Sequence, residues 1–515
     1  MIDLSRTIPD VAIRAADRWP DKAAVIDGDT TLTFAGLVEQ SRRAARAFIV
    51  AGLQPGDRFA IWAPNIHEWI WTAIGGQMAG GVLVPINTRY RGAEAGDILR
   101  RSRCKMLFTV TDFLDTNYPA MLADESLPHL WHTVLMRGQD RAGQTLEQFL
   151  TKAVDISQET LDARLADVSG TSLSDIMYTS GTTGAPKGVM STHGQVVAIF
   201  DTWSEAVGLT ENDRYLIVNP FFHTFGYKSG WLTCLLTGAT VLPEAVFDSD
   251  RILSRIETDG ITMLPGAPTV FQLLLAHENL GNTNLSSLRC AVTGAASVPV
   301  QLVRDMKNVL GFDSVYTGYG LTECGVVSIC RNGDDFETIA NTAGRPISGI
   351  DVKVVDDNDE PVPAGDAGYI KVRGFNVMQG YLDDPEATAE TISDDGWLDT
   401  GDIGWQNEDG YLKITDRAKD MYISGGFNCY PAEIENLLLN HPAVSDVAVV
   451  GKTDERMGEV GRAFVVCSTN VNADTLTAWA RDNMANYKVP REFCFIEQLP
   501  RNASGKVQKF LLTES

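Results

Sequence analysis

Residues 178–188, YTSGTTGAPKG, concentrate the residue types that bind phosphate. Gly181 and Gly184 allow backbone conformations that other residues avoid, so amide N–H groups there can turn toward an anion. Pro186 stiffens the turn. Hydroxyl and ammonium donors come from Ser180, Thr182, Thr183 and Lys187. The spacing differs from the common phosphate loop G-x-x-x-x-G-K-[ST]. Because an apolar strand precedes the loop, the pattern favours phosphate contact over a polar surface loop.

Three further segments carry groups that nucleotide chemistry needs. In YTGYGLTECG, Tyr319 could stack on a purine, Thr322 could donate to a phosphate oxygen and Glu323 could hold Mg²⁺. WLDTGDIG predicts a tight turn in which Asp402 accepts two ribose hydroxyls, and PRNASGKVQ puts Lys506 in a Gly-flanked loop. Taken alone, each is more simply interpreted as a core tyrosine, a solvated glutamate, a turn aspartate or a surface lysine.

In the N-terminal part of the chain, predicted strands and helices alternate around these segments. The stretches AAVID, RFAIWAP and VLVPIN predict short buried strands, and residues 35–51 predict a helix with Leu37, Ala44 and Phe48 on one face. This alternation predicts an α/β fold. From Asp416 on, a helix opened by Pro431 is followed by strands, a helix at residues 476–484 and a last strand. We therefore expect a large α/β N-terminal domain (1–415), a hinge (416–420) and a smaller α+β C-terminal domain (421–515).

Composition excludes several classes of function. The 43 basic and 67 acidic residues give a formal charge of −24, which disfavours binding to nucleic acid or to an anionic membrane surface. The eight cysteines show no C-x-x-C spacing and are expected to be reduced thiols of a cytoplasmic protein. The start of the chain lacks the apolar core of a signal peptide, and no apolar run predicts a membrane span. Oligomeric state is open, with a homodimer the commonest case.

Six motifs in this order resemble the adenylate-forming superfamily of acyl-CoA synthetases, luciferases and peptide-synthetase adenylation domains. They are YTSGTTGAPKGV, NPFFHTFG, TGYGLTE, WLDTGD, DRAKDMYISGGFNCYPAEIE and PRNASGK. The resemblance runs from about Thr31 to Lys506. It implies that a carboxylate attacks the α-phosphate of ATP, releasing pyrophosphate, and that the thiol of coenzyme A then displaces AMP from the acyl-adenylate.

The resemblance also implies roles for individual residues. Residues 179–187, with Thr179, would embrace the β- and γ-phosphates, while Thr322 would touch the α-phosphate and Glu323 would hold Mg²⁺. Lys506 would bridge the carboxylate and the α-phosphate. The nucleotide's base and ribose would lie against Ala295, Ala296, Gly318, Tyr319, Asp402 and Arg417.

The same resemblance implies an acyl pocket, a thiol tunnel and a hinge. His223 would gate the acyl pocket, although a core histidine packed among phenylalanines is the structural alternative. The pocket wall would include Phe225, Gly226, Tyr227, Lys228 and Gly318. Two roles are open for Lys228: part of a solvated surface, or a counter-charge for a polar oxygen of the substrate. A rotation at Lys419 would bring in the tunnel residues Gly425, Gly426 and Phe427. Asp416, Phe427 and Tyr369 depart from the residues usual at these positions.

The acid is the remaining question. No phosphopantetheine carrier follows Lys506, which favours free coenzyme A over a peptide-synthetase module. NPFFHTFGYKSGWLTCLLTGATVLP and VTGAASVPV look most like the branch that ligates coenzyme A to the hexahydroindanone-propanoate left by steroid-ring degradation. A medium- or long-chain fatty acid or an aryl-alkanoate is the alternative substrate. A nucleotide-binding protein without turnover and a luciferase-like oxygenase are the alternatives of a different class.

Overall fold

The computed structural model describes residues 2–179, 186–294, 298–424, 427–454, 456–501 and 507–513. By backbone packing the chain divides into two compact units. The first holds the described residues up to Asp351 together with Arg373–Gly396, and the second holds Val352–Val372 and the described residues from Trp397 onward. The predicted hinge at 416–420 concerns a rotation rather than packing, and it stays a prediction.

The first unit is α/β, as the alternating pattern predicts, and its strands form two sheets. Among the described residues, eight strands form one sheet in the order β19 (Gly380–Tyr381), β9 (Gly188–Thr192), β8 (Leu173–Tyr178), β4 (Val82–Pro85), β3 (Arg58–Trp62), β5 (Met106–Val110), β6 (His132–Arg137) and β7 (Gln144–Thr145). Strands β8, β4, β3, β5 and β6 are parallel to one another, whereas β9 is antiparallel to β8 and β19. Buried parallel strands of this kind need helices on both faces.

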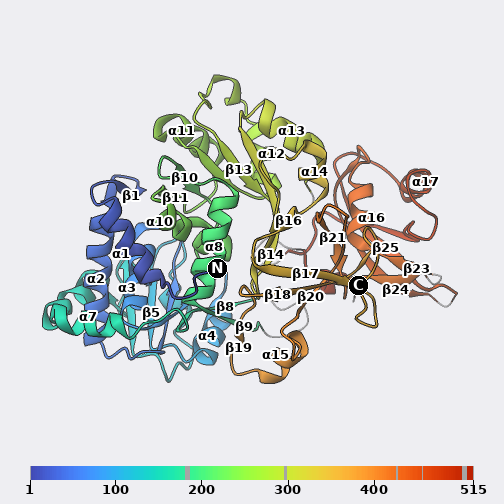
Figure 1. The fold of residues 1–515 in the computed structure, drawn as a ribbon. Helices are drawn as coiled ribbons and strands as arrows, with labels where there is room; N and C mark the ends of the chain where they lie inside the picture. Colours follow the sequence, from blue (N-terminus) through green and yellow to red (C-terminus); the bar gives the residue numbers. More distant parts are fainter. Residues whose placement is uncertain are drawn as a thin grey trace. The chain divides into compact units, whose positions relative to one another are not determined.

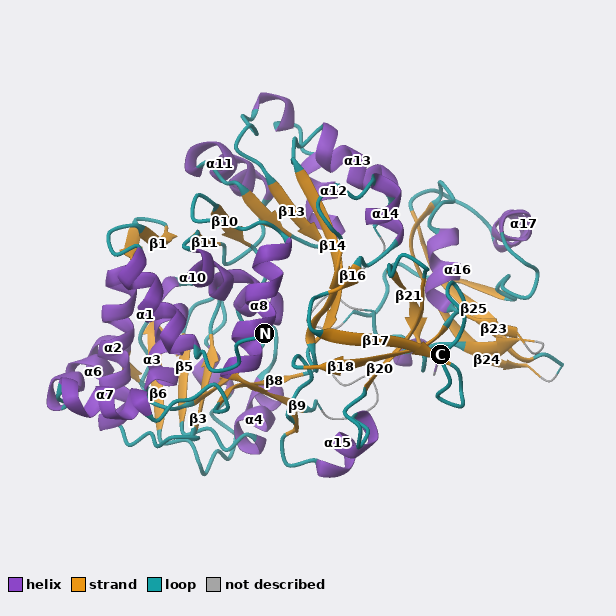
Figure 2. Cartoon of the chain, viewed as in Figure 1, coloured by secondary structure: helices purple, strands orange, loops and turns teal. Residues whose placement is uncertain are grey.

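The second sheet of this unit is also mainly parallel. Within the described part of the chain its nine strands run in the order β16 (Arg345–Pro346), β15 (Gly325–Ile329), β14 (Ser314–Leu321), β13 (Cys290–Thr293), β12 (Met263–Pro265), β10 (Arg214–Ile217), β11 (Thr240–Pro243), β1 (Ala23–Asp27) and β2 (Thr30–Thr33). Figure 2 shows helices alongside the parallel strands β10, β13 and β14.

Helices cover both sheets. Near the N-terminus α1 (Ile8–Arg18), α2 (Phe34–Val50) and α3 (His67–Met78) lie side by side (Figure 1). Thr33 caps α2 by accepting a hydrogen bond from the Gly36 N–H, and the predicted face with Leu37, Ala44 and Phe48 is buried. The other helices of this unit are α4 (Gly92–Arg101), α5 (Tyr118–Met121), α6 (Leu146–Leu150), η1 (Thr151–Asp155), α7 (Gln158–Ala166), α8 (His193–Ala206), α9 (Thr224–Gly226), η2 (Tyr227–Leu232), α10 (Thr233–Thr237), α11 (Ser249–Asp259), α12 (Pro268–Leu275), η3 (Leu280–Asn282), α13 (Val300–Asn308), α14 (Phe336–Asn341) and α15 (Pro385–Thr391).

The second unit holds two smaller sheets. One has the order β17 (Ile350–Val355), β18 (Gly368–Gly374), β20 (Leu398–Gln406) and β21 (Leu412–Arg417). Ile350 and Asp351 of β17 and Arg373 and Gly374 of β18 are counted with the first unit. The other has the order β23 (Phe427–Cys429), β22 (Tyr422–Ser424), β25 (Gly458–Cys467) and β24 (Val444–Asp454), with β26 (Glu492–Phe495) paired to β25. Its helices are α16 (Pro431–Leu438), α17 (Ala473–Asn483) and α18 (Phe510–Thr513). This mixture matches the α+β pattern expected after Asp416.

Two general expectations from composition are met. Every cysteine is a free thiol; six are buried, and Cys467 and Cys494 are partly buried. In the described part of the chain, no helix combines the length and the apolar character that a bilayer crossing requires.

Candidate active site

The predicted phosphate loop connects two antiparallel strands. Tyr178, the last residue of β8, pairs with Gly188, the first residue of β9. One residue further into the loop, the N–H of Thr179 donates to the carbonyl of Lys187 at 3.0 Å, so the base of the loop is closed by hydrogen bonds. The carbonyl of Pro186 accepts from Arg101 at 2.5 Å. The predicted residues Ser180, Gly181, Thr182, Thr183 and Gly184 lie outside the described part of the structure.

Tyr381 brings the predicted lysine and the predicted metal ligand together. It lies on β19 and pairs with Val189 of β9, one strand position beyond the loop. Its hydroxyl donates to Oε1 of Glu323 at 3.1 Å, and Nζ of Lys187 lies 4.8 Å from the centre of its ring. Burial and the neighbouring Glu323 raise the pKa of Tyr381, so the phenol stays neutral and remains a donor. Sequence reasoning missed this tyrosine, because nothing in its local sequence points to residues so distant along the chain.

Glu323 lies in the turn between β14 and β15, and the strand that leads to this turn requires glycine. Gly318 of β14 faces the partner strand so closely that an added Cβ would lie 2.8 Å from the carbonyl oxygen of Ser328. The backbone carbonyl of Glu323 also accepts from the N–H of Met378 at 2.8 Å. In the described part of the chain, Tyr381 uses one oxygen of the Glu323 carboxylate, which suits a group that also binds a hard cation.

Lys228 is buried, so its interpretation as part of a solvated face is wrong. It lies on η2, and its side chain is 4% exposed. Its ammonium is 2.7 Å from Oδ1 of Asp175 on β8 and 3.3 Å from the hydroxyl of Ser191 on β9. Asp175 itself is fully buried, and its other oxygen accepts from the Ser174 hydroxyl. A buried charge needs such a partner, and the sequence offers no means of pairing residues this far apart.

A small cavity connects Lys228 to the predicted nucleotide residues. Its walls come from β9, α8, η2 and the segment after β14, and its lining residues are Ser191, Gln195, Val196, Ile199, Phe200, Thr224, Lys228, Thr322, Gly325 and Asn376. Thr322 and Lys228 are thereby brought to one place. Tyr227 is instead fully buried, stacked on Trp231 at 4.8 Å with its hydroxyl accepting from Gln77, and it does not line this cavity.

His223 is exposed, so the interpretation as a core histidine is wrong. Its Nδ1 accepts a hydrogen bond from the N–H of Phe225 at 3.2 Å as the N-cap of α9. With Nδ1 accepting, the neutral ring carries its proton on Nε2 and can donate from there. Gly226 is needed beside it, because an added Cβ would lie 2.2 Å from the carbonyl oxygen of Pro220.

Asn65, which sequence reasoning missed, fixes the loop that leads to His223. It follows β3, and its amide group contacts the carbonyls of Ile217, Asn219 and Glu244 at 3.2, 2.9 and 3.2 Å. Its Oδ1 accepts from the N–H of Phe221 at 2.7 Å, and the residue is 4% exposed. One side chain therefore joins the ends of β3 in one sheet and β10 and β11 in the other. A polar residue directly after an apolar strand was the signal that could have found it.

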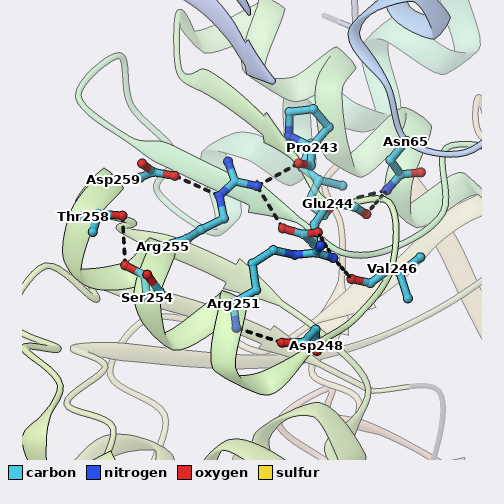
Figure 3. A network of polar contacts seen from close by, with 11 residues as sticks. Asn65, Pro243, Glu244, Val246, Asp248, Arg251, Ser254, Arg255, Thr258 and Asp259 are labelled. Carbon is cyan, nitrogen blue, oxygen red and sulfur yellow. Dashed lines mark hydrogen bonds and ion pairs between the residues drawn. The ribbon is translucent and has the colours of Figure 1, made fainter. Parts of the chain in front are cut away.

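Glu244 strengthens this junction (Figure 3). Its buried carboxylate is 2.5 Å from Arg251 and 3.0 Å from Arg255, both on α11, and Arg255 also reaches the carbonyl of Pro243 at 2.8 Å. Asp259 engages the same Arg255 at 2.8 Å. Figure 3 shows these contacts converging on the segment that Asn65 holds. The network is positioned to keep the His223 loop in place.

In the second unit, the predicted ribose residues form a pair. Asp402 stands opposite Arg417 in the register of β20 and β21, and its Oδ1 is 2.7 Å from Nε of the arginine. Asp402 is buried, and the arginine also donates to the carbonyl of Thr400 at 3.4 Å. The expectation of a tight turn at Asp402 was wrong, because this residue lies inside β20. The strand pairing itself is what brings the two side chains together.

Lys419 and Asp416 flank the end of β21. Lys419 lies in the turn that follows the strand and is exposed, as a hinge residue must be. Asp416 is buried; its two oxygens accept from the N–H groups of Arg417 and Ala432, each at 2.7 Å. Ala432 belongs to the first turn of α16, whose unpaired N–H groups favour a carboxylate. Burial nevertheless raises the pKa of Asp416 to about 6.

The family follows from a comparison of the whole chain with known proteins. A family model described as AMP-binding enzyme matches residues 13–382, and one described as AMP-binding enzyme C-terminal domain matches residues 433–506. The chain belongs to the AMP-binding enzyme family. Its predicted residues outside the described part of the structure include Ala295, Ala296, Gly425, Gly426 and Lys506, while Phe427 begins β23.

Curated AMP-binding enzymes similar to this one are coenzyme A ligases. A Rhodococcus jostii protein named 3-[(3aS,4S,7aS)-7a-methyl-1,5-dioxo-octahydro-1H-inden-4-yl]propanoyl:CoA ligase is 49% identical, over 100% of this chain and 99% of its own length. A Mycobacterium tuberculosis protein of the same name is 45% identical over 100% of both chains. A feruloyl-CoA synthase from Amycolatopsis is 37% identical over 96% of both chains.

Solved AMP-binding enzymes share the fold over nearly the full length. An anthranilate CoA ligase in complex with anthranoyl-AMP has a TM-score of 0.87 and 27% identity, covering 99% of this chain and 97% of that one. The o-succinylbenzoate CoA synthetase of Bacillus subtilis, in complex with its acyl-adenylate, has a TM-score of 0.82 and 29% identity, covering 99% of both chains. The chain is accordingly an AMP-forming acyl-CoA synthetase that uses ATP and coenzyme A as co-substrates.

Proposed function

We propose that this enzyme ligates coenzyme A to the hexahydroindanone-propanoic acid that its relatives' names specify. The observation that carries the proposal is the match of 49% and 45% identity, over the whole chain, to two ligases named for that acyl group. The motifs around His223 and Ala295, which resemble the same branch, support it. So does the buried polar group Lys228 beside the apolar wall of α8, since the acid named is a fused ring with two ketones.

The first step joins the acid to AMP. The carboxylate oxygen attacks the α-phosphorus of ATP, and the α–β phosphoanhydride bond breaks to release pyrophosphate. Residues 179–187 with Lys187 hold the leaving pyrophosphate, Thr322 contacts the α-phosphate, and Lys506 offsets the charge of the two anions as they meet. The closed base of the loop and the placement of Lys187 beside Tyr381 support this assignment.

A magnesium ion belongs to this proposal, with Glu323 as its protein ligand. Mg²⁺ is usually held by one or two carboxylates together with substrate phosphates, and it neutralises phosphate charge when bound. Glu323 fits, because Tyr381 donates to one of its oxygens and fixes the carboxylate. Adenine is assigned to Ala295, Ala296, Gly318 and Tyr319, and ribose to Asp402 and Arg417; the observed Asp402–Arg417 pair supports the last of these.

The second step transfers the acyl group to sulfur. The thiol of coenzyme A attacks the acyl carbonyl, the bond to the AMP oxygen breaks, and AMP leaves. We assign the exchange of sites to a rotation at Lys419 that withdraws Lys506 and brings in Gly425, Gly426 and Phe427 as the tunnel wall. His223 gates the acyl pocket, with Phe225, Gly226, Lys228 and Gly318 around it; Tyr227, fully buried against Trp231, is left out of the pocket wall. The exposed turn at Lys419 supports the hinge assignment.

An aryl-alkanoate is the second candidate substrate, because a feruloyl-CoA synthase is 37% identical over 96% of the chain. Pyrophosphate release should therefore be measured with the dioxo-indane propanoic acid, ferulic acid and a series of fatty acids, each with and without coenzyme A. We expect the ring propanoate to have the highest kcat/KM. A higher value for ferulate or for linear acids would overturn the substrate, and formation of ADP in place of AMP would overturn the reaction.

Three further properties stay predictions of this proposal: dependence on Mg²⁺, a homodimeric state and a cytoplasmic location. The first is tested by titrating Mg²⁺ into the pyrophosphate assay after chelation. The second is tested by light scattering of the purified chain, and the third by fractionation of cells that express it.

A further inference from the structure

The most unusual group near the candidate site is the buried ammonium of Lys228. It faces the cavity described above, together with Ser191, Thr224 and Thr322. The last two adjoin His223 and Glu323 in the sequence, so the cavity lies beside the residues assigned to the acid and the phosphate. An acid bound in the proposed position would have its ring close to Lys228.

The hydrogen bonding of Lys228 leaves one donor for a ligand. An ammonium has three N–H donors. Among the described residues, this ammonium forms an ion pair with Oδ1 of Asp175 at 2.7 Å and donates a hydrogen bond to the hydroxyl of Ser191 at 3.3 Å. A third N–H is therefore available to an acceptor that enters from the cavity.

The charge around Lys228 and the size of the cavity favour an uncharged oxygen atom as the ligand's acceptor. Asp175 is fully buried and neutralises the ammonium, so a second carboxylate there would meet a negative charge. The cavity has a volume of about 10 Å³, the space of one water-sized group, so a carbonyl oxygen fits and a whole ring does not. The apolar wall of Val196, Ile199 and Phe200 on α8 suits the hydrocarbon body that carries such an oxygen.

We propose that Lys228, held by Asp175 and Ser191, selects acids with a ring ketone by donating its third N–H to that ketone's oxygen. This inference rests on the proposed function. A linear acyl chain would place a methyl group against the ammonium and leave the N–H without an acceptor, which a low-polarity site disfavours. Lys228 is then a specificity-determining residue, while the chemistry at the carboxylate is left to other residues.

The test is a cycle of protein variants against substrate analogues. The acids are the 1,5-dioxo-indane propanoic acid and two analogues in which the ketone at ring position 1 or position 5 is replaced by CH₂. We expect the wild type to prefer the dioxo acid over one of the analogues by about 10- to 100-fold in kcat/KM, the range of a hydrogen bond to a charged donor. In Lys228→Met this preference should fall to about one, because the donor is gone.

Matched variants separate recognition from folding. Ser191→Ala removes one partner of the ammonium and should reduce the preference less than Lys228→Met does. Ser204→Ala is the control: Ser204 is a buried serine on α8 that bonds within its own helix, away from the cavity. Should Lys228→Met fail to fold with Asp175 unpaired, the double variant Asp175→Asn/Lys228→Met, which removes both charges, carries the comparison.

The outcomes are distinct. Loss of the ketone preference in the Lys228 variants, with Ser204→Ala unchanged, supports the proposal. Equal loss for all three acids would show a structural ion pair and overturn this inference alone. If the wild type turns over none of the three acids, the proposed substrate and the inference built on it both fail.

Discussion

Replacing Asp416 with asparagine should remove a specific pH dependence from the stability of the second unit. The carboxylate is 6% exposed and links β21 to the first turn of α16 through Ala432. Burial raises the pKa of Asp416 from 3.8 to about 6; among its charged neighbours, Lys509 lowers the value and Glu435 raises it. Asparagine keeps a side-chain oxygen for the Ala432 N–H but cannot titrate.

The magnitude and sign follow from linkage. Between the two pKa values the folded state binds more protons than the unfolded state, so stability falls as pH rises through this window. The stabilisation is complete below pH 3.8 and is lost above about pH 6, a total of about 3 kcal/mol at 1.36 kcal/mol per pKa unit. Between pH 5 and pH 7 the wild type should lose about 1.3 kcal/mol through this group. The Asp416→Asn variant should therefore gain that amount relative to the wild type.

Hydrogen exchange gives the assay. Exchange in peptides that cover β21 and α16, corrected for the intrinsic rate at each pH, reports the free energy of opening at this place. Asp420→Asn, in the turn that follows β21, is the control and should leave the difference between pH 5 and pH 7 as in the wild type. A constant difference between Asp416→Asn and the wild type across this range, or a change of opposite sign, would refute the burial argument.

Three other predictions concern the candidate site. Tyr381→Phe removes the donor to Glu323 and keeps the ring beside Lys187, so ATP–pyrophosphate exchange should fall about 10-fold and need more Mg²⁺; an unchanged Mg²⁺ titration would contradict this. Lys506→Ala should slow adenylation by about 100-fold or more and spare thiolation of supplied acyl-adenylate, measured as separate half-reactions; equal losses would exclude the proposed role. Asn65→Ala should lower the Tm and kcat together, because several buried backbone groups lose their partner. Asn65→Asp, which turns a carboxylate oxygen toward three carbonyls in place of the NH2 donor, should lose at least as much. A normal kcat in Asn65→Ala would show that this residue does not position the His223 loop.

Much of the architecture could be predicted because its causes are local. The strands at AAVID and RFAIWAP and the helix over residues 35–51 appear as β1, β3 and α2. Each is specified by a short apolar run or by a helical apolar face, and neither signal depends on distant residues. The tight turn predicted at Asp402 was wrong because a Thr-Gly-Asp sequence also suits a strand, and pairing with β21 decides between them.

The site was only partly predictable, for a physical reason. A loop rich in glycine, hydroxyl and lysine residues predicts an anion-binding site, so Thr179 and Lys187 could be proposed as phosphate-binding residues from their types alone. The contacts of Tyr381 and Asn65 depend on which elements are neighbours: β19 lies beside β9, and the residue after β3 contacts the loop after β10. These neighbours are far apart along the chain, so they could not be predicted from a single sequence.

Removing the Lys228–Asp175 pair is the clearest way to distinguish a role in folding stability from a role in substrate recognition. Removing two charges from water costs more than their attraction commonly returns, so replacing a buried pair with neutral groups is often neutral or stabilising by about 1–4 kcal/mol. If this pair served folding alone, the Asp175→Asn/Lys228→Met variant should have a lower Tm and should lose activity equally with all three acids. If it serves ketone recognition, the variant should keep or raise its Tm and lose only the preference for the ketone. A structural element that weakens folding yet discriminates between substrates is what a specificity determinant requires, and thermal unfolding measured beside the substrate cycle distinguishes the two cases.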